Sequence, residues 1–375
     1  MPTQIDSMDP AIVRSAPPGP VLPALAGMPK VLLHDHLDGS LRVSTLIELC
    51  RQRSIRLPTQ DPQALAGWFR ANATAGSLER YLEGFALTVA AMADLSALER
   101  VAFEAAEDAR AEGCVLAEFR MAPLLLAGHG IDPDEAVAAI LGGLSRSALP
   151  CGLIICGMRQ DPTASVAAAA ELAVRHRTGP QRTVGVVGFD LAGPERGWPA
   201  TRHEACLRRV LDAGLGLTLH AGEDDEAQRV LQAVALGAHR IGHGVRLADL
   251  LGTPLGRDAV DRLHQAQVHL EVCPTSNVQT GAAASIATHP IRALWEAGLS
   301  LSFHTDNHLI SCTDLNLEGQ ALLDLAGFQL ADLLAMQRQA LQASFMPSHH
   351  IEPARRALDE WAASHDPNPS TSCQP

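Results

Sequence analysis

Histidine and acidic side chains recur at the ends of apolar segments in this 375-residue chain. The first such segment reads "VLLHDHLDGS", where His34 and His36 are two residues apart and point to the same face of an extended strand. Three later segments end in "LHAGE", "GHG" and "HTDN", which contribute His220, His243 and Asp306. Imidazole and carboxylate donors without a thiolate suit Zn²⁺ or a similar divalent ion. A lone His-x-His pair is a common chance pattern, so the predicted metal site depends on all four segments together.

The elements that must position these residues are eight apolar runs rich in Val, Ile and Leu. The runs are continuous rather than alternating, which is typical of parallel strands buried on both faces. Segments with helical patterns separate them, so the sequence predicts an α/β fold, a (β/α)₈ TIM barrel. A doubly wound sheet is the alternative, but no G-x-G-x-x-G follows the first run. The expected strands cover residues 30–36, 114–122, 152–159, 183–190, 214–221, 239–244, 267–274 and 299–306.

In such a barrel the C-terminal ends of the strands share one rim, where catalytic sites are built. The histidines and Asp306 all fall at that rim. A second metal ion would need a bridging ligand, commonly a carbamylated lysine after the fourth strand. The fourth run, "VVGFDLAG", has no lysine. We therefore expect a single metal ion, which would lower the pKa of bound water from ~16 to about 7.

One connection is far longer than an ordinary strand-to-helix link. It covers residues 37–113 and contains helical patterns such as "SLERYLEGFALTVAAM". The sequence thus predicts a long helical insertion between strands 1 and 2, which leaves the barrel at the catalytic rim. A lid over the site is one hypothesis for it, and packing against the side of the barrel is the other.

The remaining composition limits the domain plan and the partners. Residues 1–28 and 364–375 are rich in Pro, Gly and Ser and are expected to be a flexible leader and tail around a single domain, 29–363. A net charge of −13 without a basic run argues against nucleic-acid binding, and no apolar run has the length of a membrane span. Eight cysteines without a CxxC pair are typical of a reduced, cytoplasmic protein. The oligomeric state has no signature here.

Six motifs, in this order and strand context, resemble the adenosine deaminase family of the amidohydrolase superfamily: "PKVLLHDHLDGS", "DLAG", "LHAGE", "RIGHG", "CPTSN" and "HTDN". The resemblance extends from Pro29 to about Ala363. It implies hydrolytic deamination of adenosine and 2′-deoxyadenosine to inosine-type products and ammonia, by attack of a metal-bound hydroxide at purine C6. It also implies one Zn²⁺ per chain and a small-molecule purine nucleoside as the partner.

The resemblance assigns a role to each matching residue. Glu223 would protonate purine N1, and His243 would orient or deprotonate the attacking hydroxide. Protonating N1 neutralises charge that develops on the ring, so Glu223 must be protonated beforehand and needs a raised pKa. Alone, Glu223 would equally suit the first turn of a helix. The zinc ligands would be His34, His36, His220 and Asp306, with Asp306 also counted as catalytic. The substrate contacts would be His36, Asp38 to a ribose hydroxyl, the Gly193 N–H to N3, and Asn307.

Three features depart from the family pattern. Asn307 stands where the family commonly has a second Asp that contacts N7, and an amide can donate to N7 without titrating. Asp35 lies between the two zinc-site histidines, points away from the metal, and is expected to pair with a basic residue outside the site. His304 and His308 flank the last motif and are unusual, which leaves the substrate preference open.

Other functions fit less well or remain open. A zinc deaminase of the H-x-E…P-C-x-x-C type is excluded, because the only similar stretch is "PCGLIIC". A deaminase of adenine or of a ribose-modified adenosine stays open. A binding protein that kept the barrel but lost catalysis would lack ligands or acid–base groups, and none is missing.

Overall fold

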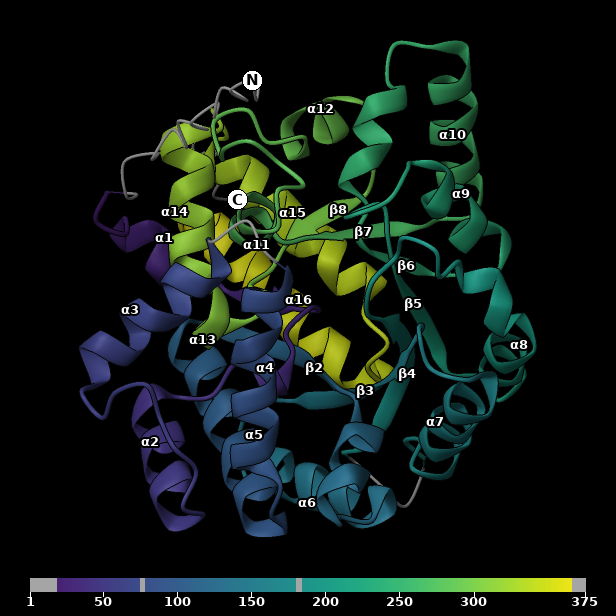
Figure 1. Cartoon of the computed structure of the whole chain (residues 1–375). Coiled ribbons are helices and arrows are strands. Elements are labelled where there is room, and N and C mark those ends of the chain that lie inside the picture. Colours follow the sequence, from purple (N-terminus) through teal and green to yellow (C-terminus); the bar gives the residue numbers. More distant parts are fainter. Residues whose placement is uncertain (1–18, 75–77, 180–183, 366–375) are drawn as a thin grey trace, which may run out of the picture.

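Eight short parallel strands form the centre of the molecule (Figure 1). The structure is a computed structural model that describes residues 19–74, 78–179 and 184–365. The (β/α)₈ architecture predicted from the apolar runs is confirmed. The strands are β1 (Lys30–Leu32), β2 (Cys114–Met121), β3 (Cys151–Met158), β4 (Val186–Ala192), β5 (Gly216–Ala221), β6 (Arg240–His243), β7 (His269–Val272) and β8 (Leu301–Phe303).

The strands pair in chain order from β1 to β8, and the segments that follow β8 and β1 meet at a seam. Just beyond these two strands, Asp35 and Asp306 form a parallel bridge. Asp306 N donates to His34 O at 3.1 Å, and His36 N donates to Asp306 O at 2.8 Å. β1 and β8 end earlier than predicted because their last residues leave the regular ladder and pair through this bridge instead. The first residue of the predicted fourth strand, 183, lies outside the described residues.

Helices surround the strands on the outside (Figure 1). The crossovers after β2 contain η2 (Pro123–His129), α6 (Pro133–Ser145), α7 (Thr163–Arg175), η3 (Ala200–His203), α8 (Glu204–Asp212), α9 (Gln228–Ala235), η4 (Val245–Leu250), α10 (Pro254–Gln265), α11 (Pro274–Gln279) and α12 (Ile291–Glu296). The chain after β8 forms α13 (His308–Ser311), α14 (Leu315–Leu325), α15 (Leu330–Ala343) and α16 (Ser348–Ser364). Among the described helices, none combines the length and apolar composition needed to cross a lipid bilayer.

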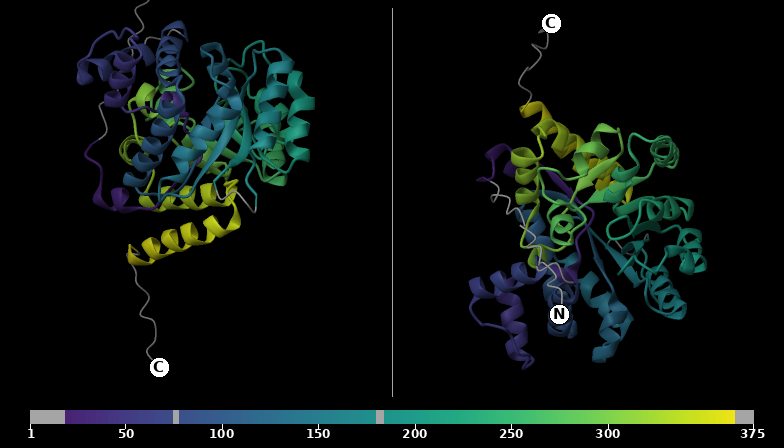
Figure 2. Two further views of the ribbon diagram at one scale, coloured as in Figure 1. Left: turned by 90° about the horizontal axis from the view of Figure 1, so that it is seen from below. Right: turned by 45° about the horizontal axis from the view of Figure 1, so that its top comes forward.

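The insertion between β1 and β2 is helical, as predicted. It consists of η1 (Leu37–Gly39), α2 (Val43–Gln52), α3 (Pro62–Ala73), α4 (Leu78–Met92) and α5 (Leu95–Ala111). α4 packs on η1 and α3 packs on α13, both of which directly follow the C-terminal ends of strands. α5 packs on β2 and α6 along the barrel side. The insertion therefore packs partly against segments that follow the C-terminal ends of strands and partly along the barrel side, and Figure 2 shows α2 and α3 at the end of the molecule opposite α15 and α16.

The leader ends earlier than the predicted boundary at residue 28. Pro23–Gly27 form α1, and Leu25 and Met28 are fully buried, so burial of these two apolar side chains fixes this stretch on the barrel. Leu22 N also donates to Gln320 Oε1 at 2.9 Å. Residues 1–18 of the predicted leader and 366–375 of the predicted tail lie outside the described residues.

Charged side chains fill part of the barrel interior beneath the catalytic rim. Glu118, Arg120, Arg240 and Glu271 are all fully buried. Arg240 Nε lies 2.6 Å from Glu271 Oε1, and its Nη1 lies 2.7 Å from Glu118 Oε2. The Arg240 guanidinium also lies 3.7 Å from the ring centroid of Phe345, which faces it from the N-terminal end of the barrel. Such buried charges are tolerated because each is paired.

Candidate active site

Five side chains from four strand ends converge at the C-terminal rim. Donor atoms of His34, His220, His243 and Asp306 all lie within 4.8 Å of one another, and all four residues are buried. His36 joins them, because its Nε2 lies 3.3 Å from His220 Nε2 and 3.6 Å from Asp306 Oδ1. The four residues predicted as metal ligands therefore lie in one cluster together with His243.

The spacing of the donor atoms fits a shared metal ion. Two nitrogens bound to a tetrahedral zinc ion at 2.0–2.1 Å lie roughly 3.3 Å apart. His36 Nε2 and His220 Nε2 are 3.3 Å apart, and His34 Nε2 is 3.2 Å from Asp306 Oδ1. His34 Nε2 is buried and makes no hydrogen bond within the described part of the chain. Where Glu271 holds the ring hydrogen on Nδ1, the Nε2 lone pair faces the Asp306 carboxylate oxygen, and a cation bound to both atoms would satisfy them.

Buried carboxylates orient two of the imidazoles from behind. Glu271 Oε2 lies 2.8 Å from His34 Nδ1, and Asp190 Oδ2 lies 2.8 Å from His220 Nδ1. Arg120 pairs with both acids: its Nη2 lies 2.7 Å from Glu271 Oε2, and its Nη1 lies 2.9 Å from Asp190 Oδ2. Burial alone would raise the pKa of Asp190, but His220 and Arg120 hold it well below its usual value. Each carboxylate thus keeps the ring hydrogen on Nδ1 and turns Nε2 toward the cluster.

Glu223 lies beside the cluster with its carboxyl largely shielded from water. Its Oε1 accepts a hydrogen bond from Thr280 Oγ1 at 2.9 Å, and its Oε2 lies 3.4 Å from His243 Nε2. Burial and the nearby charge of Asp306 raise the pKa of Glu223 to about 8. A carboxyl with this pKa is protonated at neutral pH and can act as an acid.

His243 and Asp306 both have left-handed backbone conformations, with φ of 64° and 61°. Such conformations are costly for residues other than glycine and concentrate at functional sites. Asn277 Nδ2 donates to His243 Nδ1 at 3.0 Å, and Ser276 Oγ donates to Asp306 Oδ2 at 2.5 Å. Burial keeps the pKa of His243 well below its usual value. The ring is therefore neutral, with its hydrogen on Nε2.

The residues predicted to bind substrate lie on the same rim. Asp38 in η1 is buried, burial raises its pKa to about 7, and its Oδ1 has no hydrogen-bond partner among the described residues. Gly193 follows β4 with φ of 95°, and a Cβ there would lie 2.3 Å from Gln160 Oε1, so only glycine suits this position. Asn307 is buried against Gly39, where a Cβ would lie 1.9 Å from Asn307 Oδ1. Small apolar residues at the ends of β2, β3 and β4 form a cluster separate from the main core: Ala122, Cys156 and Ala192.

Asp35 and the two unusual histidines lie outside the cluster. Asp35 Oδ2 lies 2.6 Å from His308 Nδ1, which is the pairing with a basic residue that the sequence predicts. Glu112 Oε1 lies 3.0 Å from His308 Nε2 on the other side of the ring. His304 is fully buried, accepts from Leu33 N through Nδ1, and faces Ser302 Oγ at 2.7 Å. Both histidines therefore support the strand ends.

The sequence analysis missed several residues that hold the site in place. The sequence does contain a signal for three of them, because a charged residue inside a buried apolar strand requires a partner: Arg120, Asp190 and Glu271. Ser276, Asn277 and Thr280 form one short segment, yet they contact three different residues of the cluster. The "CPTSN" motif contains two of them, but sequence spacing does not indicate which residues they reach.

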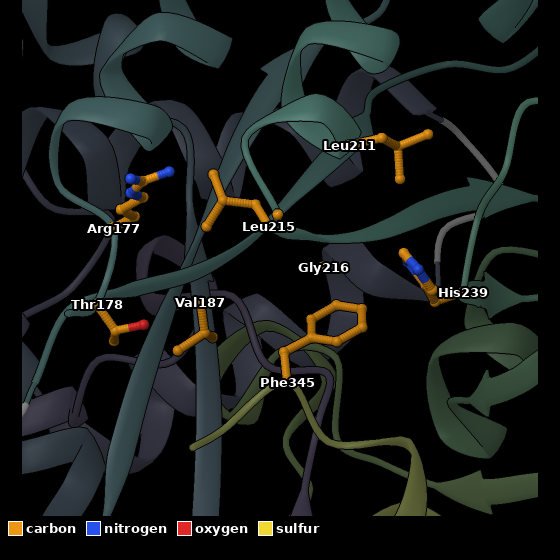
Figure 3. A pocket seen from close by; sticks show the side chains of 9 residues that line it. Arg177, Thr178, Val187, Leu211, Leu215, Gly216, His239 and Phe345 are labelled. Carbon is orange, nitrogen blue, oxygen red and sulfur yellow. The ribbon is translucent and has the colours of Figure 1, made fainter. Parts of the chain in front are cut away.

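A cavity of about 360 Å³ lies elsewhere, at the N-terminal end of the barrel (Figure 3). Val187, Gly216 and His239 line it from the starts of β4, β5 and β6, and Phe345 closes one side. The clustered residues lie at the other end of the same strands, so this cavity is separate from the candidate active site.

Known proteins resemble the chain along most of its length. A protein-family model described as adenosine deaminase matches residues 29–361. The adenosine deaminase of Mycobacterium tuberculosis is 41% identical over 345 residues, which cover 88% of this chain and 92% of that protein.

Solved structures share the fold. The N6-mAMP deaminase of arabidopsis superposes with a TM-score of 0.76 at 25% identity, covering 90% of this chain and 99% of that one. The adenine deaminase of Arthrobacter aurescens gives a TM-score of 0.80 at 23% identity, covering 89% and 99%. At that identity the second likeness concerns the fold alone.

Proposed function

The chain belongs to the adenosine deaminase family, and from that membership we propose that it hydrolyses adenosine and 2′-deoxyadenosine to inosine, 2′-deoxyinosine and ammonia. The observation that carries the proposal is the position of the largely buried Glu223 carboxyl, whose pKa is raised, beside a convergent set of metal-type donors. This pairing supplies an acid and a metal position at one place, which hydrolytic removal of an aromatic amino group requires.

The proposed ligands of the metal ion are His34, His36, His220 and Asp306. Their donor spacing supports a small tetrahedral-type ion, and a set of three imidazoles and one carboxylate favours zinc. A zinc ion held there would lower the pKa of water from ~16 to about 7 and make hydroxide available at neutral pH. We assign His243 to a separate role, because its Nδ1 already accepts from Asn277 and its Nε2 faces Glu223.

Glu223 is the proposed proton donor to N1. Water adds at C6 while N1 takes the Glu223 proton, so no full negative charge develops on the ring. The C6–N bond then breaks and the amino group leaves as ammonia, with C6 left bonded to oxygen. Over the cycle N1 keeps the proton from Glu223, one proton of water restores the protonated Glu223, and the other leaves with ammonia.

His243 is proposed to orient the attacking oxygen. The N–H group at Nε2 can donate to the attacking oxygen. The ring cannot also take a proton from that oxygen, because Nε2 carries a hydrogen and the Nδ1 lone pair already accepts from Asn277. Of the two roles expected from the sequence, orientation and deprotonation, the hydrogen-bond pattern favours orientation.

The substrate contacts follow the same assignment. Asp38 accepts a ribose hydroxyl, the Gly193 N–H donates to N3, and the Asn307 amide donates to N7. The unpartnered buried oxygen of Asp38 favours a nucleoside over free adenine, because a free base would leave that oxygen without a hydrogen bond.

A substrate panel tests the proposal. Zinc-loaded protein is incubated with adenosine, 2′-deoxyadenosine, adenine and N6-methyl-AMP while ammonia and methylamine release are followed. We expect turnover of both nucleosides, loss of activity after chelator treatment, and its return when zinc is restored. Turnover of adenine or of the methylated nucleotide alone would contradict the proposed substrate, and no turnover of any 6-aminopurine would contradict the reaction.

A further inference from the structure

The loop that carries Glu223 is held by one buried acid from another loop. Glu195, located after β4, is only 3% exposed. Its Oε1 accepts from Gly222 N at 2.8 Å. Its Oε2 accepts from the backbone N–H groups of Glu223, Asp224 and Asp225 at 2.9, 2.9 and 3.1 Å. Four consecutive backbone N–H groups therefore converge on a single carboxylate.

Consecutive N–H groups of this kind form an anion-binding concavity, or nest. Gly222 makes the turn possible, since its φ is 69° and a Cβ there would lie 2.6 Å from Val230 Cγ2. α9 begins only at Gln228, so the nest lies before the helix rather than in its first turn. We call Glu195 and the four N–H groups of residues 222–225 the Glu195 clamp.

The clamp is tied to the barrel from its other side. Arg159, 1% exposed, places Nη1 3.7 Å from Glu195 Oε1 and balances its charge. Its Nη2 donates to Leu191 O at 2.7 Å and also to His220 O. Arg159 O in turn accepts from His203 Nε2 at 2.9 Å. Arg159 follows β3 and reaches carbonyls in β4 and β5, so the clamp is anchored to three adjacent strands.

The clamp and Thr280 act on different parts of the same residue. Thr280 contacts the Glu223 side chain, whereas Glu195 fixes its backbone through the N–H group. Reaction rates depend steeply on such placement, and a displacement of about 1 Å can lower a rate by roughly 100-fold. We propose that Glu195 is a positioning residue, which fixes residues 222–225 so that the Glu223 carboxyl meets the substrate nitrogen. The inference rests on the proposed function, in which Glu223 is the proton donor.

Replacing Glu195 by Gln tests the clamp, because the side chain keeps its size but loses its charge and one acceptor oxygen. We expect kcat for adenosine to fall by roughly 10- to 100-fold while KM changes by less than about 3-fold. Metal content should stay at the wild-type level. Amide hydrogen exchange should become faster at residues 222–225 and remain unchanged in the strands. Glu204→Gln is the matched control. That acid is exposed at the start of α8, so its replacement should change neither kcat nor the amide exchange of residues 222–225.

A double-mutant cycle separates positioning from general support of the fold. If Glu195 acts through Glu223, then Glu195→Gln should lower kcat little further in a Glu223→Gln background. A merely structural role would lower kcat by the same factor in both backgrounds. Equal factors, an unchanged kcat, or unchanged exchange at residues 222–225 would each overturn the inference.

A second variant, Glu195→Asp, keeps the charge but shortens the side chain and should lose less of kcat than Glu195→Gln. If neither variant yields folded, metal-loaded protein, Glu195 is a folding determinant and the inference fails. The exchange measurement needs no substrate, so it distinguishes this failure from that of the proposed function. An inactive wild-type chain would contradict the function, and unchanged exchange in Glu195→Gln would contradict the clamp.

Discussion

Asp190 Oδ2 lies 2.8 Å from His220 Nδ1, and both side chains are buried near the C-terminal ends of the adjacent strands β4 and β5. The contact fixes the ring hydrogen on Nδ1 and presents Nε2 to His36 and the rest of the cluster. A carboxylate in this position also makes the imidazole a stronger metal ligand.

Asp190→Asn should weaken zinc binding by roughly 10- to 100-fold, because the amide orients the ring less strongly and carries no charge. Competition with a chromophoric chelator measures the affinity directly. Asp212→Asn, at an exposed position at the end of α8, is the control. An affinity equal to that of the wild type would show that Asp190 does not tune the metal site.

Glu223→Gln should keep its zinc but lose roughly 100- to 10,000-fold in kcat, because an amide cannot supply the N1 proton. Metal analysis and ammonia release on the same sample measure the two properties. An unchanged rate would mean that the proton comes from another group. Loss of zinc would instead point to a role for Glu223 in building the metal site.

Asn307→Asp should remain active and acquire a new pH dependence. A carboxyl donates to N7 only while it is protonated, so activity should decline as pH rises through the pKa of the new acid. The wild-type amide does not titrate, and the ratio of the two kcat/KM profiles therefore isolates the effect. A ratio that is constant with pH would contradict the N7 contact, and loss of zinc would show that position 307 serves the metal.

His308→Gln should destabilise the fold at mildly acidic pH. Burial alone would lower the pKa of His308, but Asp35 and Glu112 raise it well above 6.5. A histidine whose pKa is raised on folding stabilises the folded state fully at pH values below its unfolded pKa of 6.5. This stabilisation is lost as the pH rises through the pKa of the folded state. Removing the cation leaves two acids without their partner, which should lower the free energy of unfolding by roughly 3 kcal/mol near pH 6.

Urea unfolding of zinc-saturated protein near pH 6 and near pH 9 tests this sign. The difference between wild type and His308→Gln should shrink at the higher pH. His129→Gln, at an exposed position in η2, should show no difference at either pH. A gap that widens toward alkaline pH would mean that the ring does not act as a cation.

The barrel could be predicted from the sequence because its strands are buried on both faces and appear as continuous apolar runs. The metal-type residues were also accessible, since each follows such a run. The contacts that support these residues could not be predicted from the sequence. Glu195 reaches residues 222–225 across two loops, and Leu25 makes α1 part of the fold by burial against α14. These effects depend on tertiary proximity, which local patterns do not encode.

The strand lengths illustrate the same limit. The runs around Asp35 and Asp306 were expected to be regular strands, but the two residues form the seam where the sheet closes on itself. Asp306 adopts a left-handed backbone there, which is uncommon even for Asp and is not indicated by the apolar run before it.

The segment from Ser276 to Thr280 has a consequence for exchanging loops between members of the family. Its side chains contact Asp306, His243 and Glu223, which follow three different strands. Inserting or deleting a single residue in this segment would disturb three parts of the reaction centre together. The segment after β7 should therefore be kept intact in such exchanges, and transplanting a new substrate preference should begin with the long insertion after β1.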